Sequence, residues 1–345
     1  MRVPNWLGDA VISLPAVRAL RGVLPHAEIA VAVRPHLTDF YARESSVDRV
    51  IPYTARSLYD KHNFARSLRP ERFDLALLLQ NAFDAALLAW MANIPERIGY
   101  RRDARGLLLT RAIPVPEPGD IPRHERFYYL ELLRRAGLIE RLAPSEEIRL
   151  DRVDAARESG LAQIAILGAP VPAIGISPGA AYGSAKRWFP ERFAETSFAL
   201  SPVARSALIF GSAADRAACD QVASALSRSP LTVRNLAGQT TLREFIDLAA
   251  ACRLFLTNDS GSMHVAAALG VPTVAVFGPT DDTTTGPVSR FAQVVREHAE
   301  CSPCLLRECP IDHRCMLRVT SGRASAAALH LWEESAPTWT QEARF

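Results

Sequence analysis

The stretch NDSGSMH (258–264) has the composition of an anion-binding turn. It follows RLFLT (253–257), an apolar run that predicts a buried strand, and it precedes the apolar pattern of a helix. The free N–H groups and the positive dipole end of such a helix attract a phosphate or diphosphate, and Gly261 allows close approach to the backbone. The alternative interpretation is that Asp259 or Ser260 only caps the helix.

A second loop of small residues, PGAAYGSAKRW (178–188), follows another predicted strand, AIGIS (173–177). It contains Lys186, one of only two lysines among the 40 basic residues of the chain. A lysine ammonium is a compact cation that suits a phosphate, whereas the alternative is an ordinary surface loop. Because ligands bind outside the carboxyl ends of parallel strands, both loops are expected to converge on one anion site. The P-loop pattern GxxxxGK[ST] is absent.

Asp9 is a third candidate, in the turn PNWLGD (4–9) that precedes a helical apolar pattern over 11–20. It is either the N-cap of that helix or a carboxylate that faces a cleft between two domains and acts as a general base. Only three residues precede the turn, whereas a strand commonly has about five or six. We therefore expect either a very short first strand or native residues missing before Met1.

Short apolar runs alternate with helical patterns throughout the chain, which indicates βαβ units and parallel sheets. We expect an α/β protein with two Rossmann-like, doubly wound domains, over residues 1–168 and 173–320, and a cleft between them. The boundary is placed at GAPVPA (168–173), and residues 321–345 are expected to form a helix and tail that pack back on the first domain. The predicted strands span 28–33, 47–53, 74–80, 173–177, 206–212, 231–238, 253–258 and 272–279.

The composition limits the function classes. The chain has 345 residues, of which 48% are hydrophobic, a net charge of +3 and a mean hydropathy of +0.02. This length suits two domains, and so small a net charge does not indicate nucleic acid as a partner. The sequence has no run of about 18 apolar residues and no signal-peptide layout, so we expect a cytoplasmic protein.

Four cysteines cluster in HAECSPCLLRECPIDHRC (298–315), with the spacing C-x2-C-x4-C-x5-C. They could bind a structural zinc ion, form one or two disulfides, or remain free thiols that pack a loop. The spacing is not that of a standard zinc finger. The four residues are Cys301, Cys304, Cys309 and Cys315.

The segment RIGYRRDARGLLLTR (97–111) is basic and partly apolar. Its arginines, Arg101 and Arg102 among them, suit phosphate or carboxylate groups and transient contact with a membrane surface. The alternative is a solvated loop in a protein whose basic residues are nearly all arginine.

Three motifs occur together: NWLGDAV (5–11), PGAAYGSAKRW (178–188) and TNDSGSMHVAAALGVPTVAVFGPT (257–280). In this order and at these distances they resemble the ADP-heptose–lipopolysaccharide heptosyltransferases of glycosyltransferase family 9, and most of all its heptosyltransferase II group. The resemblance covers essentially the whole chain, and the block over 257–280 is its most specific part.

This resemblance implies a GT-B fold, in which two Rossmann-like domains enclose the active site. It also implies inverting transfer of L-glycero-D-manno-heptose from ADP-heptose to the inner core of lipopolysaccharide. The acceptor would be an anionic glycolipid, the Kdo-lipid A core, so we expect a cytoplasmic enzyme that transiently contacts the inner membrane. No cofactor, no catalytic metal and no nucleic acid are expected.

The resemblance also assigns roles by motif position. Asp9 would deprotonate the acceptor hydroxyl in a direct displacement. On the donor side, Lys186 would pair with the diphosphate, and Ser260 and Gly261 would offer it backbone N–H groups. The remaining assignments place Asp259 at the sugar hydroxyls or in a role orienting its loop, His264 alongside, and Thr240 near the adenine. His264 is otherwise a packed helix residue. Arg101 and Arg102 are expected to contact the acceptor.

Three competing functions remain open. A nicotinamide-dependent oxidoreductase would need G-x-G-x-x-G after a strand, which none of the predicted strands has. The second competing function is that of another family 9 transferase with a different nucleotide sugar or acceptor. The third is a catalytically impaired member that only binds a nucleotide.

Overall fold

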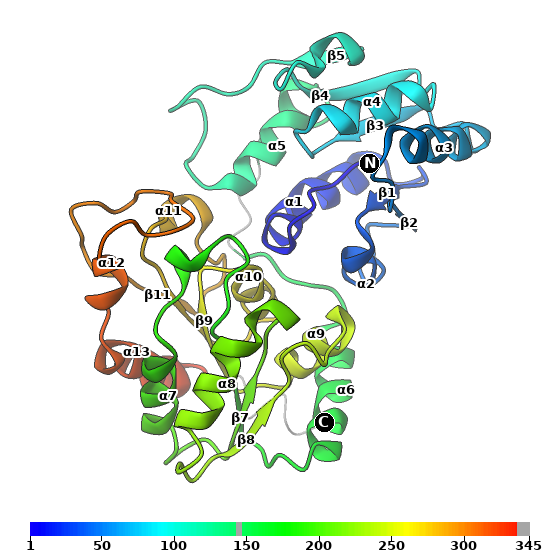
Figure 1. Ribbon diagram of the computed structural model, residues 1–345. Coiled ribbons are helices and arrows are strands. Elements are labelled where there is room, and N and C mark those ends of the chain that lie inside the picture. Colours follow the sequence, from blue (N-terminus) through cyan, green and yellow to red (C-terminus); the bar gives the residue numbers. More distant parts are fainter. Residues whose placement is uncertain (143–146, 337–345) are drawn as a thin grey trace. The chain divides into compact units, whose positions relative to one another are not determined.

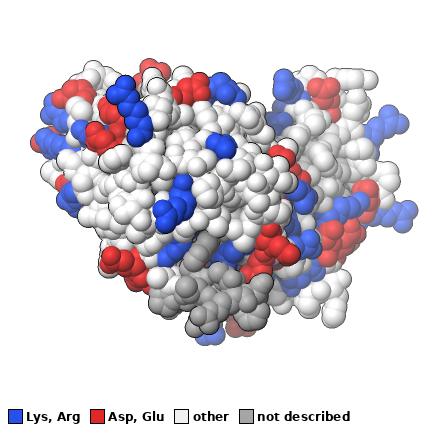
Figure 2. Space-filling view, turned by 90° about the horizontal axis from the view of Figure 1, so that it is seen from below, with Lys and Arg blue, Asp and Glu red and all other residues white. Residues whose placement is uncertain are grey.

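The chain folds into two compact units, Met1–Ser145 and Glu146–Phe345. The computed structural model describes residues 1–142 and 147–336 (Figure 1). In both units the named strands pair in parallel. Within these described ranges no helix has the length and apolar character needed to cross a bilayer. Basic and acidic side chains are interspersed on the face shown in Figure 2.

A six-stranded sheet forms the centre of the second unit. Its strand order is β11-β10-β9-β6-β7-β8, which within this unit is 6-5-4-1-2-3, the order of a dinucleotide-binding sheet. The order reverses between the neighbours β6 and β9, where Ile176 lies opposite Leu256. The strands are β6 (Ala173–Ser177), β7 (Ser206–Ile209), β8 (Thr232–Asn235), β9 (Leu254–Asn258), β10 (Thr273–Val276) and β11 (Ala292–Val295).

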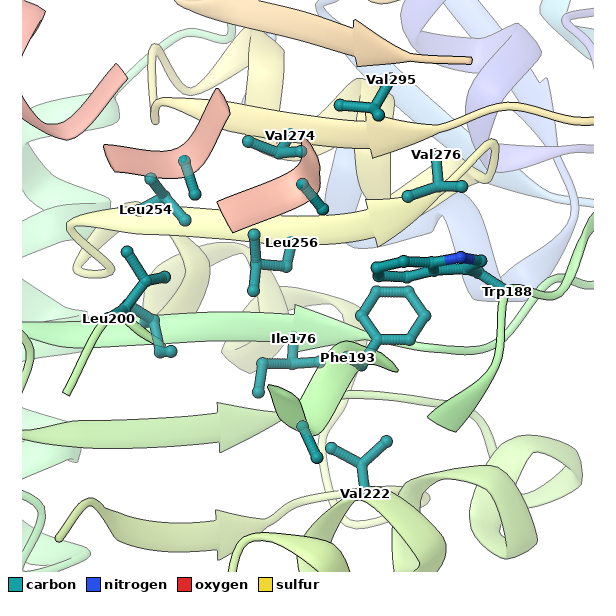
Figure 3. Close-up of a cluster of buried hydrophobic side chains, with 14 of the residues drawn as sticks. Ile176, Trp188, Phe193, Leu200, Val222, Leu254, Leu256, Val274, Val276 and Val295 are labelled. Carbon is teal, nitrogen blue, oxygen red and sulfur yellow. The ribbon is translucent and has the colours of Figure 1, made fainter. Parts of the chain in front are cut away.

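Apolar side chains on this sheet pack against the helices that cover it. Figure 3 shows Ile176, Leu256 and Val276 pointing into one cluster with Trp188 and Phe193. The Trp188 and Phe193 ring centroids are 5.0 Å apart, edge to face, and the Trp188 indole N–H donates to the Val319 carbonyl at 3.0 Å. The core therefore fixes the chain directly after Lys186.

Eight helices are described in the second unit. They are α6 (Val153–Ile166), α7 (Pro190–Ala199), α8 (Arg216–Ala225), α9 (Leu242–Ala250), α10 (Gly261–Ala268), α11 (Asp282–Thr285), α12 (Arg314–Leu317) and α13 (Ser321–Glu334). Helix α9 begins with a capping box: Glu244 N–H donates to the Thr241 hydroxyl at 3.2 Å, and Thr241 N–H donates to the Glu244 carboxylate at 2.7 Å.

The division between the units differs from the predicted boundary at 168–173. Helix α6 packs closely on α9, and a Cβ on Gly160 would lie only 1.9 Å from the Asp247 carbonyl oxygen. The chain before α6 is also attached to the second unit, since Leu150 N–H donates to the Ala268 carbonyl at 2.8 Å. Proline and glycine at 168–173 therefore mark a turn inside this unit, between α6 and β6.

The C-terminal helix α13 packs on α7 and on strands β9, β10 and β11. Its buried residues Ala324, Ala328 and Leu331 belong to the core of the second unit. The described helix of this segment thus belongs to the core of the second unit, residues 337–345 lie outside the described part of the chain, and the packing of residues 321–345 on the first domain stays a prediction.

The first unit repeats the same strand order around a very short first strand. Parallel pairs join β1 to β2 and β3 to β4 and β5, and Arg2 bridges Ala32 of β1 and Leu78 of β3. With Arg2 in the first position, the order is again 3-2-1-4-5-6. The strands are β1 (Ala30–Val33), β2 (Arg49–Pro52), β3 (Leu75–Leu78), β4 (Glu96–Tyr100) and β5 (Arg111–Ile113).

Met1 and Arg2 make the backbone bonds of a central strand. Met1 N donates to the Ala30 carbonyl at 2.5 Å, and Leu79 N–H donates to the Arg2 carbonyl at 3.0 Å. A cavity of about 450 Å³ lies beside them, lined by Met1, by the beginnings of β1 and β3, and by apolar side chains such as Leu20 and Phe64. The described helices here are α1 (Leu7–Val23), α2 (Thr38–Tyr41), α3 (Leu58–Leu68), α4 (Phe83–Met91) and α5 (Glu125–Arg135).

Each of the predicted strands contains an observed strand. Three observed strands were not predicted: β4, β5 and β11. Strand β4 has the sequence ERIGY and β5 has RAI, so charged residues interrupt their apolar pattern.

Candidate functional site

The carboxyl ends of β6 and β9 meet at the point where the strand order of the second sheet reverses. Ser177 at the end of β6 pairs in register with Thr257 of β9. The loop that contains Lys186 leaves one strand here, and the turn that contains Ser260 leaves the other. The two predicted loops are therefore neighbours at the usual ligand position of such a sheet.

Asn258 ties these two loops together. Its Oδ1 accepts a hydrogen bond from Trp188 N–H at 2.9 Å, and its Nδ2 donates to the Pro178 carbonyl at 2.7 Å. The Asn258 side chain is fully buried, so each bond satisfies a group that has no access to water. One side chain thereby fixes both ends of the segment that carries Lys186.

Lys186 and Asp259 form a largely buried ion pair. The Lys186 Nζ lies 2.6 Å from Asp259 Oδ2, and the Thr280 hydroxyl donates to the same oxygen at 2.6 Å. Lys186 is the last residue of a short 3₁₀ turn, Ser184–Lys186, and Asp259 directly follows β9. The structure thus brings together two residues that the sequence assigned to different parts of a ligand.

The start of α10 is not closed by a side-chain cap. Ser260 is the N-cap residue but makes no side-chain hydrogen bond to the first turn; its hydroxyl lies 3.2 Å from the Thr257 hydroxyl instead. Asp259, the other proposed cap, contacts Lys186. The capping interpretation is therefore wrong for both residues, and α10 begins at Gly261 with its N–H groups and positive dipole end beside the Lys186 loop.

The other two predicted donor residues lie on the same unit. His264 is in the first turns of α10 and is 6% exposed. Thr240 is partly exposed after β8, immediately before the N-cap Thr241 of α9. Strand β8 is at the sheet edge and is separated from β6 by β7, so Thr240 lies further from Lys186 along the sheet.

The cysteine-rich segment 298–315 folds against the Lys186 loop. Ala185 N–H donates to the Arg307 carbonyl at 2.9 Å, and the His313 Nε2 lies 2.9 Å from the Ala185 carbonyl. All six cysteines are free thiols, and the described residues contain no group of three or more His, Cys, Asp or Glu that could bind a metal. The zinc, disulfide and free-thiol hypotheses for Cys301, Cys304, Cys309 and Cys315 stay predictions, and the segment that carries these residues contacts the Lys186 loop.

Asp9 lies in the first unit, within the first turn of α1. The N-cap of that helix is Trp6, so the N-cap interpretation of Asp9 is wrong. Helix α1 packs on α5, which contributes the buried Tyr129. Burial raises the pKa of Tyr129 well above its usual value, and the negative charge of Asp9 raises it further. Asp9 is partly exposed and lies on the carboxyl side of the very short first strand.

The basic segment 97–111 divides into exposed and structural arginines. Arg101 and Arg102 follow β4 and are exposed, and Arg102 Nη1 donates to the Tyr128 hydroxyl at 3.4 Å. Arg105 is fully buried and donates to the Tyr100 carbonyl at 2.8 Å and to Asn81 Oδ1 at 3.1 Å. Burial lowers the pKa of Arg105 to about 10. Arg105 therefore supports the loops after β3 and β4, and only its exposed neighbours remain as candidates for an external anion.

The model of glycosyltransferase family 9 (heptosyltransferase) matches residues 61–314. Lipopolysaccharide heptosyltransferase 2 of Salmonella typhimurium is 35% identical over 301 residues, which cover 85% of this chain and 86% of that protein. The chain belongs to glycosyltransferase family 9. The resemblance inferred from the three motifs is confirmed, and the protein is a glycosyltransferase.

Solved structures agree with this family 9 assignment. The structure of Escherichia coli ADP-heptose lps heptosyltransferase II is 30% identical, with a TM-score of 0.82 over 97% of this chain and 98% of that one. A family 9 glycosyltransferase from Veillonella parvula is 21% identical, with a TM-score of 0.81 over 97% of this chain and 96% of that one. The predicted GT-B fold of two Rossmann-like units is confirmed, and the oxidoreductase alternative is excluded.

Sequence reasoning misses two residues of this candidate site, Asn258 and Thr280. Asn258 was interpreted only as part of a polar turn, although a buried amide at a strand end is itself a signal that two backbone segments need bridging. Thr280 follows the strand β10, whose carboxyl end lies beside that of β9. Thr280 reaches Asp259 because β9 and β10 are neighbours in the sheet. The sequence alone does not give this order of strands.

Proposed function

We propose that this glycosyltransferase transfers L-glycero-D-manno-heptose from ADP-heptose to the inner core of lipopolysaccharide. The observation that carries the proposal is the position of Lys186 beside the uncapped start of α10, at the switch point of the second sheet. A nucleoside diphosphate suits both features. The relatives' names support the rest, since they specify ADP-heptose as a donor and lipopolysaccharide as an acceptor for those proteins.

The donor half of the proposed reaction needs stabilisation of a leaving group. Breaking the bond between heptose and phosphate develops negative charge on the departing ADP. The Lys186 ammonium and the N–H groups at Gly261 are fixed in place before the reaction, so they stabilise that charge without reorganising. Thr240, further along the sheet edge, is proposed to lie near the adenine.

Asp259 has two roles in this proposal. It holds Lys186 in position at 2.6 Å, and Thr280 fixes the carboxylate in turn. Its remaining acceptor capacity is available to a hydroxyl of the transferred sugar, and His264 lies one turn further along α10. Asp259 therefore orients the cation and, with the donor bound, contacts the heptose.

The acceptor half is assigned to the first unit. Asp9 acts as the general base that deprotonates the attacking hydroxyl, and the attack displaces ADP directly with inversion. Arg101 and Arg102 are exposed and bind the anionic groups of the Kdo-lipid A acceptor. Because this acceptor is a glycolipid, the enzyme works in the cytoplasm with transient contact to the inner-membrane surface.

Transfer to a defined acceptor tests this proposal. The protein is incubated with ADP-heptose and with Kdo₂-lipid A that carries one heptose, and the lipid mass is measured. We expect the mass of one further heptose. Donor binding without transfer would identify a catalytically impaired member. Transfer only from another nucleotide sugar, or only to another acceptor, would identify a different family 9 activity.

A further inference from the structure

The cysteine-rich segment 298–315 is attached to two loops of the donor site. Tyr182 in the Lys186 loop donates its hydroxyl to the Leu305 carbonyl at 2.8 Å. On the other side, Leu305 N–H donates to the Pro279 carbonyl at 2.9 Å, next to Thr280. The segment therefore bridges the loops that follow β6 and β10.

Gly183 permits the closest of these approaches. A Cβ at this position would lie 2.2 Å from the Arg307 carbonyl oxygen, which accepts the hydrogen bond from Ala185 N–H. Any larger residue would push the segment away from the Lys186 loop. The backbone of Arg307 is thus held against Gly183 and Ala185, and Ala185 directly precedes Lys186.

The Arg307 side chain shares an aromatic ring with Lys186. The Arg307 Cζ lies 5.1 Å from the centroid of the Tyr182 ring, and the Lys186 Nζ lies 4.8 Å from the same centroid. Cations at such distances are attracted to the ring by its quadrupole. The Tyr182 ring therefore contacts both Lys186 and Arg307, which belong to different segments of the chain.

The positive charges of Lys186 and Arg307 differ in whether a carboxylate balances them. The charge of Lys186 is balanced by Asp259 at 2.6 Å, and the nearby Arg187 lies 3.4 Å from Asp215. Arg307 is exposed, and within the described residues its guanidinium has no carboxylate partner. Arg307 is therefore the cation at this site whose charge remains available to an incoming anion.

We propose that Arg307 binds the diphosphate of the nucleotide-sugar donor together with Lys186, and that the cysteine-rich segment serves to present it there. The planar guanidinium forms paired hydrogen bonds to phosphate oxygens, whereas the Lys186 ammonium acts as a point charge. This inference rests on the proposed function and deepens it, because it adds a second cation to the donor site and gives the segment 298–315 a role.

Calorimetric titration with ADP and with AMP tests the proposal. Arg307→Ala is expected to weaken ADP binding by about 10–100-fold, the usual range for hydrogen bonds to a charged group. AMP lacks the second phosphate and is expected to lose much less affinity, so the ratio of the two affinities falls. Arg307→Lys keeps the charge and is expected to retain part of the preference for ADP. An unchanged ADP-to-AMP ratio in Arg307→Ala would overturn the proposal.

Two controls separate this result from other failures. Arg228→Ala removes an exposed arginine between α8 and β8, at the opposite ends of the strands, and is expected to leave both affinities unchanged. An equal loss in Arg228→Ala would mean that Arg307 acts only through net charge, which contradicts the proposal. If the unmodified protein binds no ADP, the proposed function itself fails, which is distinct from a selective loss in Arg307→Ala.

Discussion

The Lys186 ammonium lies 2.6 Å from Asp259 Oδ2, and their side chains are only 13% and 5% exposed. The cation proposed to meet the substrate is therefore already part of a buried pair. Breaking such a pair from one side leaves an uncompensated charge, which costs more than the pair itself contributes. Lys186 consequently affects both ligand binding and stability, and the two effects need to be separated.

Lys186→Ala is expected to weaken ADP binding and also to lower the free energy of unfolding by about 3–5 kcal/mol, the usual cost of leaving a buried charge unpaired. The double variant Lys186→Met, Asp259→Asn removes both charges and is expected to recover most of that stability without recovering ADP binding. Denaturant unfolding and calorimetry measure the two quantities. Equal stability of the single and double variants would contradict the buried-pair argument.

Asp9→Asn is expected to reduce the rate of heptose transfer by about 100–10,000-fold, the contribution commonly made by a general base. The affinity for ADP is expected to remain near that of the unmodified protein, because the donor residues belong to the other unit. Product formation under single-turnover conditions measures the first effect and calorimetry the second. Full transfer activity in Asp9→Asn would remove Asp9 from the mechanism.

Asn258→Leu is expected to destabilise the protein and to weaken ADP binding together. The change removes bonds to Trp188 N–H and the Pro178 carbonyl, and each buried group left without a partner costs about 1–3 kcal/mol. Asn258→Asp keeps the acceptor for Trp188 N–H but places a buried carboxylate oxygen against the Pro178 carbonyl, so it is expected to lose stability and affinity for ADP as well. A normal affinity in Asn258→Leu would show that the Lys186 loop is positioned without this residue.

In a protein produced with Met1 as its first residue, the buried amino group of Met1 predicts a pH-dependent stability. Burial lowers its pKa from 8.0 to about 5, with the charge of Arg2 as a second cause. Between these two values the unfolded chain binds the additional proton, so the free energy of unfolding rises as the pH increases from 5 to 8, by up to about 4 kcal/mol. Acetylation of the amino group is expected to remove this slope, and denaturant titrations over that pH range measure it.

The cavity beside Met1 gives a related prediction. Adding three apolar, β-branched residues before Met1 is expected to fill the space between β1 and β3 and to raise the unfolding free energy, at about 1.5–3 kcal/mol for each side chain that becomes fully buried. A Gly-Ser extension of equal length likewise moves the charged amino group away from Met1 but does not fill the cavity. Equal stability of the two extensions would mean that the cavity does not accept a strand.

The sequence predicted the features that depend on local pattern. Apolar strands such as β6 and β9 follow from residues adjacent in the chain. The loop of Lys186 and the turn at Ser260 were recognised because each follows such a strand. Their convergence on one site also followed, since parallel strands present their carboxyl ends at one edge.

Long-range packing decided what the sequence could not show. The prolines at 168–173 resemble a linker, yet the fit of Gly160 against α9 attaches α6 to the second unit. The packing of α13 on β9 and β10 likewise depends on contacts between residues far apart in the chain. The pairing of Lys186 with Asp259, and of Arg307 with the ring of Tyr182, joins residues far apart in the chain, for which no spacing rule exists.

A crystal structure of the ADP complex tests directly whether Lys186 and the start of α10 bind the diphosphate. We expect the diphosphate within hydrogen-bonding distance of the Lys186 Nζ and the Gly261 N–H, at the carboxyl ends of β6 and β9. A diphosphate bound elsewhere on the second unit, or on the first unit, with Lys186 still paired only to Asp259, would contradict it.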